Sequence, residues 1–406
     1  MSKLAAATTL FLVAALPAAD AQQTTFNPSV SFGFAYTDNV DYLDQAGATT
    51  GDTGATFGAV LPLVRKINQG SLRLTYDVGT IAYQDESQFD TTNHLASFDF
   101  YRESRREATW RVSTRYAKTD QQRTSPILPT EILPNQTDGL DDANLSLTNR
   151  TDRETIDAAV DYGWRIGRRW GLTAGFNAGQ STLAGGTDVE DRTWYGTSFG
   201  VRNTVSAKSS VGMGYSFRRV ELDTSGTEDF QTLDFFFDRD LGRKLKLELL
   251  VGGLSRSPDG SESDTQVFGS ASFSFNEGLT LGPVRLGFSA GVSPGKAEGL
   301  TGTAMNSTAG FSISGVRTDP MNWRIGTFYN HRDPFESGEP STDTLRVGVG
   351  AERRISRLFG LRFGADYSDQ TSDDPILEVN YTRAELNLVV YPLGGTRIAG
   401  RSARTP

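Results

Sequence analysis

The sequence predicts an all-β fold, a closed antiparallel transmembrane barrel of about eighteen strands, with sixteen as the alternative count. Three observations support this. A short apolar leader opens the chain, period-two alternation runs from residue 28 to 392, and short turns alternate with longer loops. No apolar run near about 20 residues follows the leader, so a membrane-spanning helix is not expected. A hydrophobic content of 37% suits a barrel strand, in which only every second residue must be apolar.

The leader has the three parts of an export signal. Lys3 gives a basic start, residues 4–18 are apolar, and Ala19-Asp20-Ala21 fits the small-x-small cleavage pattern. We therefore predict a cleaved signal peptide over residues 1–21. Residues 22–406 then form a single outer-membrane barrel with a short C-terminal periplasmic tail. The alternative is a retained tethering helix.

The alternation can be followed directly in the residues. Leu72, Leu74 and Tyr76 interleave with Arg73 and Asp77, which gives a strand with one apolar and one polar face. The same pattern recurs around Phe34, Leu61, Tyr76, Phe98, Val112, Val160, Phe176, Phe199, Tyr215, Phe235, Leu249, Phe273, Phe288, Phe311, Ile325, Val347, Phe363 and Leu388. Strands of about ten residues are predicted at these centres, with the first and last forming the seam.

The connections are unequal in length. Short ones such as 66–70 and 356–360 alternate with longer ones such as 39–53 and 369–377. Tight periplasmic turns and longer outside loops are typical of outer-membrane barrels. The longest loop, 119–143, is partly apolar, and we expect it to fold inward as a constriction.

The two faces predict which side meets lipid. A soluble protein of this size would be expected to divide into domains, and a propeller or β-helix would show a fixed repeat, yet neither linker nor repeat is visible. Four tryptophans lie next to short turns, where an interfacial girdle is expected, and Trp194 lies near a long loop; the four are Trp110, Trp164, Trp170 and Trp323. We therefore expect the apolar face to meet lipid and the charged face to surround water.

Composition excludes several kinds of function. The net charge of −9 argues against a nucleic-acid binder, and the absence of Cys excludes disulfides and thiolate metal sites. The acidic segments 38–52 and 259–264 offer oxygen atoms to calcium, but their spacing matches no defined loop. No metal, cofactor or nucleic acid is predicted.

The charged residues within the strands are the candidate functional residues. They are Arg73, Asp77, Arg111, Arg115, Asp161, Arg165, Arg285, Arg324, Arg346, Arg362 and Arg383. Arginine holds carboxylates and phosphates through paired hydrogen bonds, and charged rings set pore selectivity. The alternative is that these arginines pair with carboxylates such as Asp99, Glu248 and Asp366 and only stiffen the interior.

An enzyme is not expected. Some outer-membrane barrels are lipid hydrolases that use a serine and a histidine at the outer leaflet. The two histidines, His94 and His331, both lie near the loop end of a strand, and His94 shares the face of Phe98. Neither belongs to a recognisable nucleophile motif, so an interfacial role is the simpler interpretation.

The first strand, FGFAYTDNV, resembles the opening of outer-membrane β-barrel porins encoded near exopolysaccharide and exosortase loci. The matching positions are Tyr36, Asp38 and Asn39, and NRTDRETIDAAVDYGW with GRRWGL resembles a mid-barrel hairpin of that family. One departure is a tail after the last strand, which leaves Tyr391 as the candidate insertion signal.

The resemblance implies a porin-like channel in a Gram-negative outer membrane, for polysaccharide export or for diffusion of anionic solutes. The partners it implies are outer-membrane lipid and lipopolysaccharide, the barrel assembly machinery and a polysaccharide export system. The alternatives are a structural or adhesive surface barrel with a closed lumen and, third, a lipid-modifying enzyme. Conductance of the purified protein separates the channel from the closed barrel.

Overall fold

The computed structural model describes most of the chain after the leader. The described residues are 24–40, 50–104, 107–120, 152–184, 191–223, 226–242, 244–259, 263–279, 282–296, 303–316, 321–335, 340–374 and 378–392. The predicted signal peptide, the tail after residue 392 and most of the predicted inward loop lie outside these residues. The first two residues of that loop, 119 and 120, belong to a strand.

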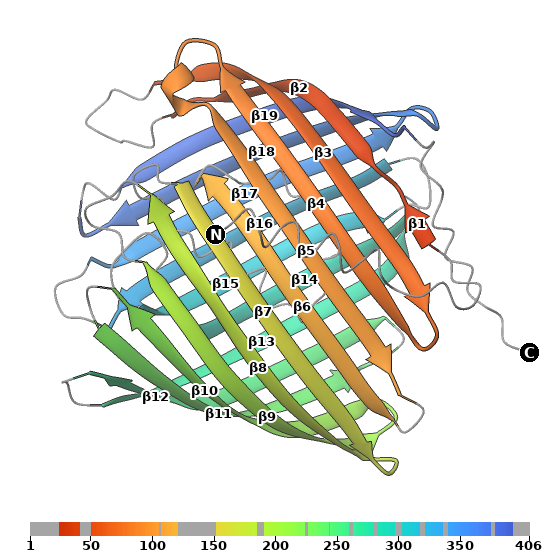
Figure 1. The fold of residues 1–406 in the computed structure, drawn as a ribbon, viewed down its shortest axis with the longest axis vertical. Helices are drawn as coiled ribbons and strands as arrows, with labels where there is room; N and C mark the ends of the chain where they lie inside the picture. The colour runs from red at the N-terminus through yellow and green to blue at the C-terminus, as the bar shows by residue number, and fades with distance from the viewer. Residues whose placement is uncertain are drawn as a thin grey trace, which may run out of the picture.

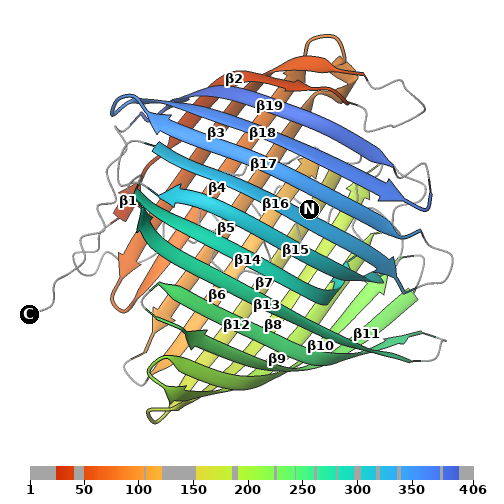
Figure 2. The same ribbon diagram turned by 180° about the vertical axis from the view of Figure 1, so that it is seen from behind.

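One antiparallel sheet winds around and closes on itself (Figures 1 and 2). Each wall strand pairs with the strand before and after it in sequence, and β19 pairs with β2 to close the ring. The strands are β1 (Thr24–Phe26), β2 (Ser29–Thr37), β3 (Asp52–Ile67), β4 (Gly70–Tyr83), β5 (Thr91–Glu103), β6 (Ala108–Asp120), β7 (Asp152–Ile166), β8 (Trp170–Ala184), β9 (Arg192–Ser206), β10 (Ser209–Leu222), β11 (Gly226–Asp240), β12 (Leu245–Pro258), β13 (Asp264–Leu279), β14 (Gly282–Lys296), β15 (Thr303–Val316), β16 (Met321–Pro334), β17 (Thr342–Arg354), β18 (Phe359–Ser372) and β19 (Val379–Val390). A single 3-10 turn, η1 (Ser87–Phe89), interrupts the strands within the described residues.

The barrel wall has 18 strands, because β1 and β2 are two parts of one strand. Phe26 of β1 pairs with Leu63 of β3, and Ser29 of β2 pairs with Val60, so both parts keep one register. Pro28 lies between them, and proline cannot donate a ladder hydrogen bond. The predicted count of eighteen is confirmed, and sixteen is wrong.

The seam joins the two predicted terminal strands. Phe32 and Phe34 of β2 lie opposite Leu388 and Leu386 of β19. Because this pairing covers both strands along most of their length, the described barrel has no open sheet edge at the seam, as a bilayer requires of a spanning sheet.

The strands are longer than the predicted ten residues. β3 has 16 residues and β17 has 13. At about 3.3 Å per residue and a tilt near 40°, a strand of about 14 residues rises roughly 35 Å, more than the apolar band of about 25 Å. The extra residues carry the wall past the apolar band, where outward positions such as Asp343 and Asp369 are polar. Hydropathy alone could not reveal this extension.

The turns that join β3 to β4 and β7 to β8 show how the short connections are made. Gln69 and Gly167 both adopt positive φ, of 60° and 66°. That left-handed conformation suits the tight two- and three-residue turns between twisted strands. Glycine adopts it without steric cost at position 167, as expected for GRRWGL.

The outward face is apolar and exposed. Phe34 is 67% exposed and Phe199 is 58% exposed, and every second residue along the wall strands continues this surface. Trp110, Trp164 and Trp170 are each about half exposed near the short turns. An apolar belt of this extent is far larger than the patches that soluble monomers expose, so its medium must be apolar. Among the described residues, no helix is long and apolar enough to cross a membrane.

The inner face departs from the expected polar surface at its loop end. Five residues of inward parity, Trp194, Val220, Leu222, Phe230 and Leu254, form a buried apolar cluster with Met305, and Phe268 and Phe335 pack against it. Trp194 points inward and is only 5% exposed, so it takes no part in an outward girdle. A small hydrophobic core therefore covers part of the wall at the loop end of the barrel.

Candidate functional site

The inner wall carries all of the predicted candidate residues. On each strand they alternate with outward aromatic or aliphatic residues, as Arg346 alternates with Leu345 and Val347. Arg73 and Asp77 lie on β4, Arg111 and Arg115 on β6, Asp161 and Arg165 on β7, Arg324 on β16, Arg346 on β17, Arg362 on β18 and Arg383 on β19. Position 285 of β14 has the inward register, opposite Ser314, and its side chain lies outside the described residues.

Four neighbouring strands bring part of this set together. Arg73 on β4 lies opposite Asp99 on β5, and Arg111 on β6 lies opposite Asp161 on β7. The Arg111 guanidinium donates to Asp99 across 3.5 Å. Arg115 lies opposite Asp157, four residues further along β6 toward the longer loop. Strands β4 to β7 thus carry a band of alternating charge.

A second band lies on β17 to β19. Arg362 donates through Nε and Nη2 to Glu352, at 3.3 and 3.1 Å. Arg383 donates to Glu385 at 3.2 Å and lies opposite Asp366 in the strand register. These arginines are held by carboxylates, which fits the structural alternative for this part of the set.

Three of the predicted arginines lack such partners. Within the described residues, the side chains of Arg165, Arg324 and Arg346 make no ion pair or hydrogen bond, and Nε and Nη2 of Arg346 are both without an acceptor. Arg73, Asp77, Arg115 and Asp161 each have an interaction partner. The wall at β16 and β17 therefore carries positive charge that no described carboxylate neutralises.

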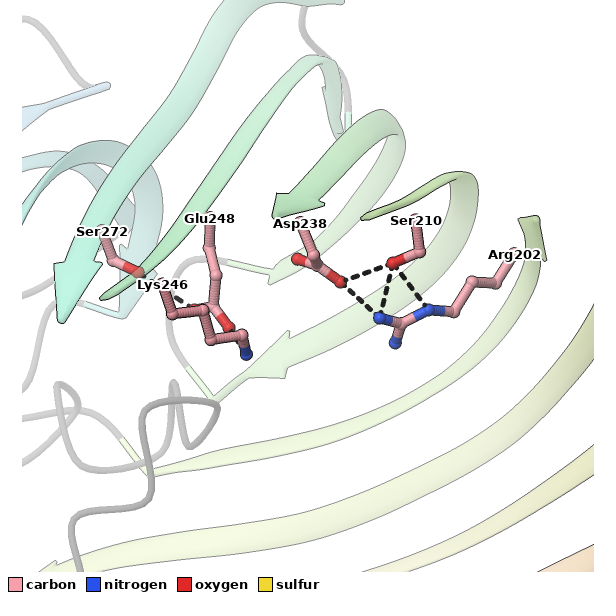
Figure 3. Close-up of polar contacts among 6 residues, drawn as sticks. All are labelled: Arg202, Ser210, Asp238, Lys246, Glu248 and Ser272. Atoms are coloured by element: carbon pink, nitrogen blue, oxygen red, sulfur yellow. Dashed lines mark hydrogen bonds and ion pairs between the residues drawn. The ribbon is translucent and has the colours of Figure 1, made fainter. Parts of the chain in front are cut away.

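A polar network that was not predicted from sequence lies at the turn end of β9 to β11, shown in Figure 3. Arg202 donates to Ser210 Oγ through Nε and Nη2, at 3.1 and 2.6 Å, and to Asp238 at 2.5 Å. Ser210 in turn donates to Asp238 at 3.1 Å. Arg202 has the same parity as Gly200 and the opposite parity to Val201, so the alternation that identified the other candidates could have found it.

A second group in Figure 3 lies on β12 and β13. Lys246 pairs with Glu248, and Ser272 donates to Glu248 at 3.0 Å. Both groups lie near the short turns that follow β9, β11 and β13. They place alternating charge around the turn end of the inner wall.

A buried ion pair lies at the opposite, loop end. Arg256 on β12 pairs with Glu228 on β11, and their side chains are 7% and 3% exposed. The Arg256 guanidinium also lies 4.8 Å from the ring centre of Phe335, and that of Arg218 lies 5.8 Å from Trp194. Cationic groups over aromatic faces are stabilised by the ring quadrupole. This part of the wall is buried and densely packed.

Inward glycines allow charged side chains to lie along the wall. A Cβ atom at Gly175 would approach Asp161 Oδ1 to 2.8 Å, and one at Gly214 would approach Asp234 Oδ2 to 2.8 Å. Both distances are below normal contact, so each carboxylate lies in space that only glycine leaves.

The two histidines lie on the outward face. His94 Nδ1 is 2.8 Å from the Tyr76 hydroxyl, and His331 Nδ1 is 3.0 Å from Asp343 Oδ1. In the part of the chain that the structure describes, no group of three His, Asp or Glu side chains is placed to hold a metal ion.

Tyr391 follows β19 and contacts the turn between β17 and β18. Its hydroxyl donates to Glu352, its ring lies 4.2 Å from the Arg354 guanidinium, and its N–H donates to Leu358 at 2.8 Å. Burial, with the hydrogen bond to Glu352, raises the pKa of the Tyr391 hydroxyl. The Tyr391 hydroxyl thus stays protonated and donates to Glu352, which links the residue after β19 to β17.

Comparison with known proteins finds similarity in structure only. No protein-family model and no curated protein matches the chain. Pseudomonas aeruginosa OpdQ is 13% identical, with a TM-score of 0.45 over 90% of this chain and 97% of its own. P. aeruginosa OccK9 (OpdG) is 10% identical, with a TM-score of 0.46 over 91% and 98%. Acinetobacter baumannii OccAB3 is 11% identical, with a TM-score of 0.43 over 90% and 98%. At these identities and TM-scores, the similarity does not indicate a ligand or an activity for this chain.

Proposed function

We propose that the chain is a porin-like channel of a bacterial outer membrane that favours small anionic solutes. The observation that carries the proposal is the inner wall at β16 and β17, where Arg324 and Arg346 have no carboxylate partner among the described residues. Unpaired guanidinium groups that line a channel raise the local concentration of anions. The exposed apolar belt supports placement in a membrane.

Planar-bilayer recording tests this function. Under a KCl gradient, the reversal potential of the purified protein should have the sign of chloride preference. Arg324→Gln with Arg346→Gln should shift it toward equal permeability, because the unpaired charges of β16 and β17 are removed. The matched control is Arg353→Gln, which removes an exposed outward arginine from the same strand and should leave selectivity unchanged. Cation preference in the unaltered protein would contradict the proposal.

Polysaccharide export is a second candidate, and the resemblance of the first strand favours it. The two candidates share a ligand chemistry, because many exported polysaccharides carry carboxylates, which arginine binds through paired hydrogen bonds. Glucuronate and a charged oligosaccharide added to one side of the bilayer distinguish the two. Block of the current by the oligosaccharide supports polysaccharide export, whereas block by glucuronate alone supports a path for small anions and removes export.

A closed surface barrel is the remaining alternative. It predicts folded, membrane-inserted protein without conductance. Finding that state would overturn the channel and leave the loops as the functional part.

A further inference from the structure

Three polar side chains form a row on the outward face near the loop ends of β15, β16 and β17. Ser307 lies directly opposite His331, and His331 lies directly opposite Asp343. The row has the same outward parity as Tyr329 and Phe311, which are 41% and 43% exposed. These residues therefore lie at the edge of the apolar belt on the side of the longer loops.

The histidine and the carboxylate are already arranged for proton transfer. His331 Nδ1 lies 3.0 Å from Asp343 Oδ1. A carboxylate at this position accepts a proton from Nδ1, which leaves Nε2 as the proton acceptor. Tyr329 also donates to Asp343 and holds the carboxylate in place. The His331 side chain is 39% exposed, so the imidazole can be reached from outside the barrel.

Ser307 lies on the other side of His331 from the carboxylate. Directly opposite residues on antiparallel strands have Cβ atoms about 4.5–5.5 Å apart, which places the Ser307 side chain next to that of His331. Contacts between nucleophile and base are often loose before substrate binds. Serine, histidine and aspartate thus occur in the order that nucleophilic hydrolysis requires.

A shallow, open groove lies beside the row. Its volume is about 540 Å³, and Ser307 and Tyr329 line one side of it. Four of its outward residues are small, namely Gly269, Ala271, Ala290 and Ala309, and Val292 borders them. Small residues in an otherwise bulky apolar belt leave a depression that a lipid chain can fill.

We propose that Ser307 and His331 form a hydrolytic site for ester-linked acyl lipids, with Asp343 as the positioning residue. The acyl chain lies in the groove, and the ester carbonyl lies at Ser307. Oγ attacks the carbonyl carbon while Nε2 of His331 takes the hydroxyl proton. The ester C–O bond breaks, and the leaving alcohol takes that proton, which gives an acyl-serine. Interfacial water, deprotonated by His331, then releases the fatty acid and restores Ser307.

The test uses the full chain in detergent micelles with a fluorophosphonate probe and a phospholipid substrate. Labelling should map to Ser307 and disappear in Ser307→Ala. His331→Asn should slow hydrolysis by about 10²–10⁴-fold, the usual contribution of general acid–base catalysis. The matched control is His94→Asn, which changes the other outward histidine at a loop end, where the partner is Tyr76 rather than a carboxylate.

Asp343 needs a separate readout. Asp343→Asn should lower kcat with little change in KM, and Asp343→Glu should recover part of the rate, because a carboxylate again faces Nδ1. Unchanged conductance and heat-modifiable migration on gels establish that each variant is folded. Hydrolysis at the background rate in the unaltered protein, or equal loss in His94→Asn and His331→Asn, would overturn the site. Neither result would bear on the proposed channel.

Discussion

Val347→Arg is expected to lower the free energy of unfolding by about 2–4 kcal/mol. Val347 lies near the middle of β17 on the outward face and is 42% exposed. If its surroundings are acyl chains, a guanidinium there must be taken out of water with no partner. Guanidinium-induced unfolding from phospholipid vesicles, followed by tryptophan fluorescence, measures the change.

The matched control for this prediction is Ala351→Arg. Ala351 lies on the same face of the same strand, beside Arg353 and close to the short turn. At that depth the cost should be only about 0–1 kcal/mol. Equal losses of stability at the two positions would mean that the cost of an arginine on this face does not depend on its depth in a bilayer.

Glu228→Gln is expected to destabilise the barrel by about 3–5 kcal/mol, because it leaves a buried guanidinium without its carboxylate. The Arg256 and Glu228 side chains are 7% and 3% exposed, so water cannot replace the lost charge. The apolar cluster around Leu254 and Phe230 would then surround an uncompensated cation. The same vesicle unfolding experiment measures the loss.

Asp99→Asn is the control for the buried pair. It breaks an ion pair with Arg111 whose side chains are 37% and 47% exposed. Exposed pairs contribute about 0–1 kcal/mol, so its effect should be small. A large loss of stability in Asp99→Asn together with a small loss in Glu228→Gln would contradict the assignment of Arg256–Glu228 as the buried ion pair and Arg111–Asp99 as the exposed one.

The strands themselves could be predicted because lipid on one side and a polar interior on the other impose period two on every strand. Each predicted centre from Phe34 to Leu388 falls within its own wall strand, and the predicted seam pairs as expected. The inward direction of Arg73, Arg324 and the other candidates followed from the same parity. Their role in selectivity stays a prediction.

The partners of these residues could not be predicted, since the register between strands depends on turn geometry and the stagger of the barrel. Alternation cannot tell that Arg362 meets Glu352 while Arg346 meets no carboxylate. It also cannot place Ser307 beside His331, because the two residues lie on different strands. Trp194 resembled a loop-side tryptophan in sequence and proved to be part of the inner cluster.

Site-directed spin labelling along β17 tests the two-sided wall most directly. The chain has no Cys, so single cysteines at positions 344 to 350 can be labelled in vesicles without background. Accessibility to oxygen should peak at 345, 347 and 349, and accessibility to a water-soluble nickel chelate should peak at 344, 346, 348 and 350. Equal access of the nickel chelate to both sets would contradict the account, because water would then reach the side assigned to lipid.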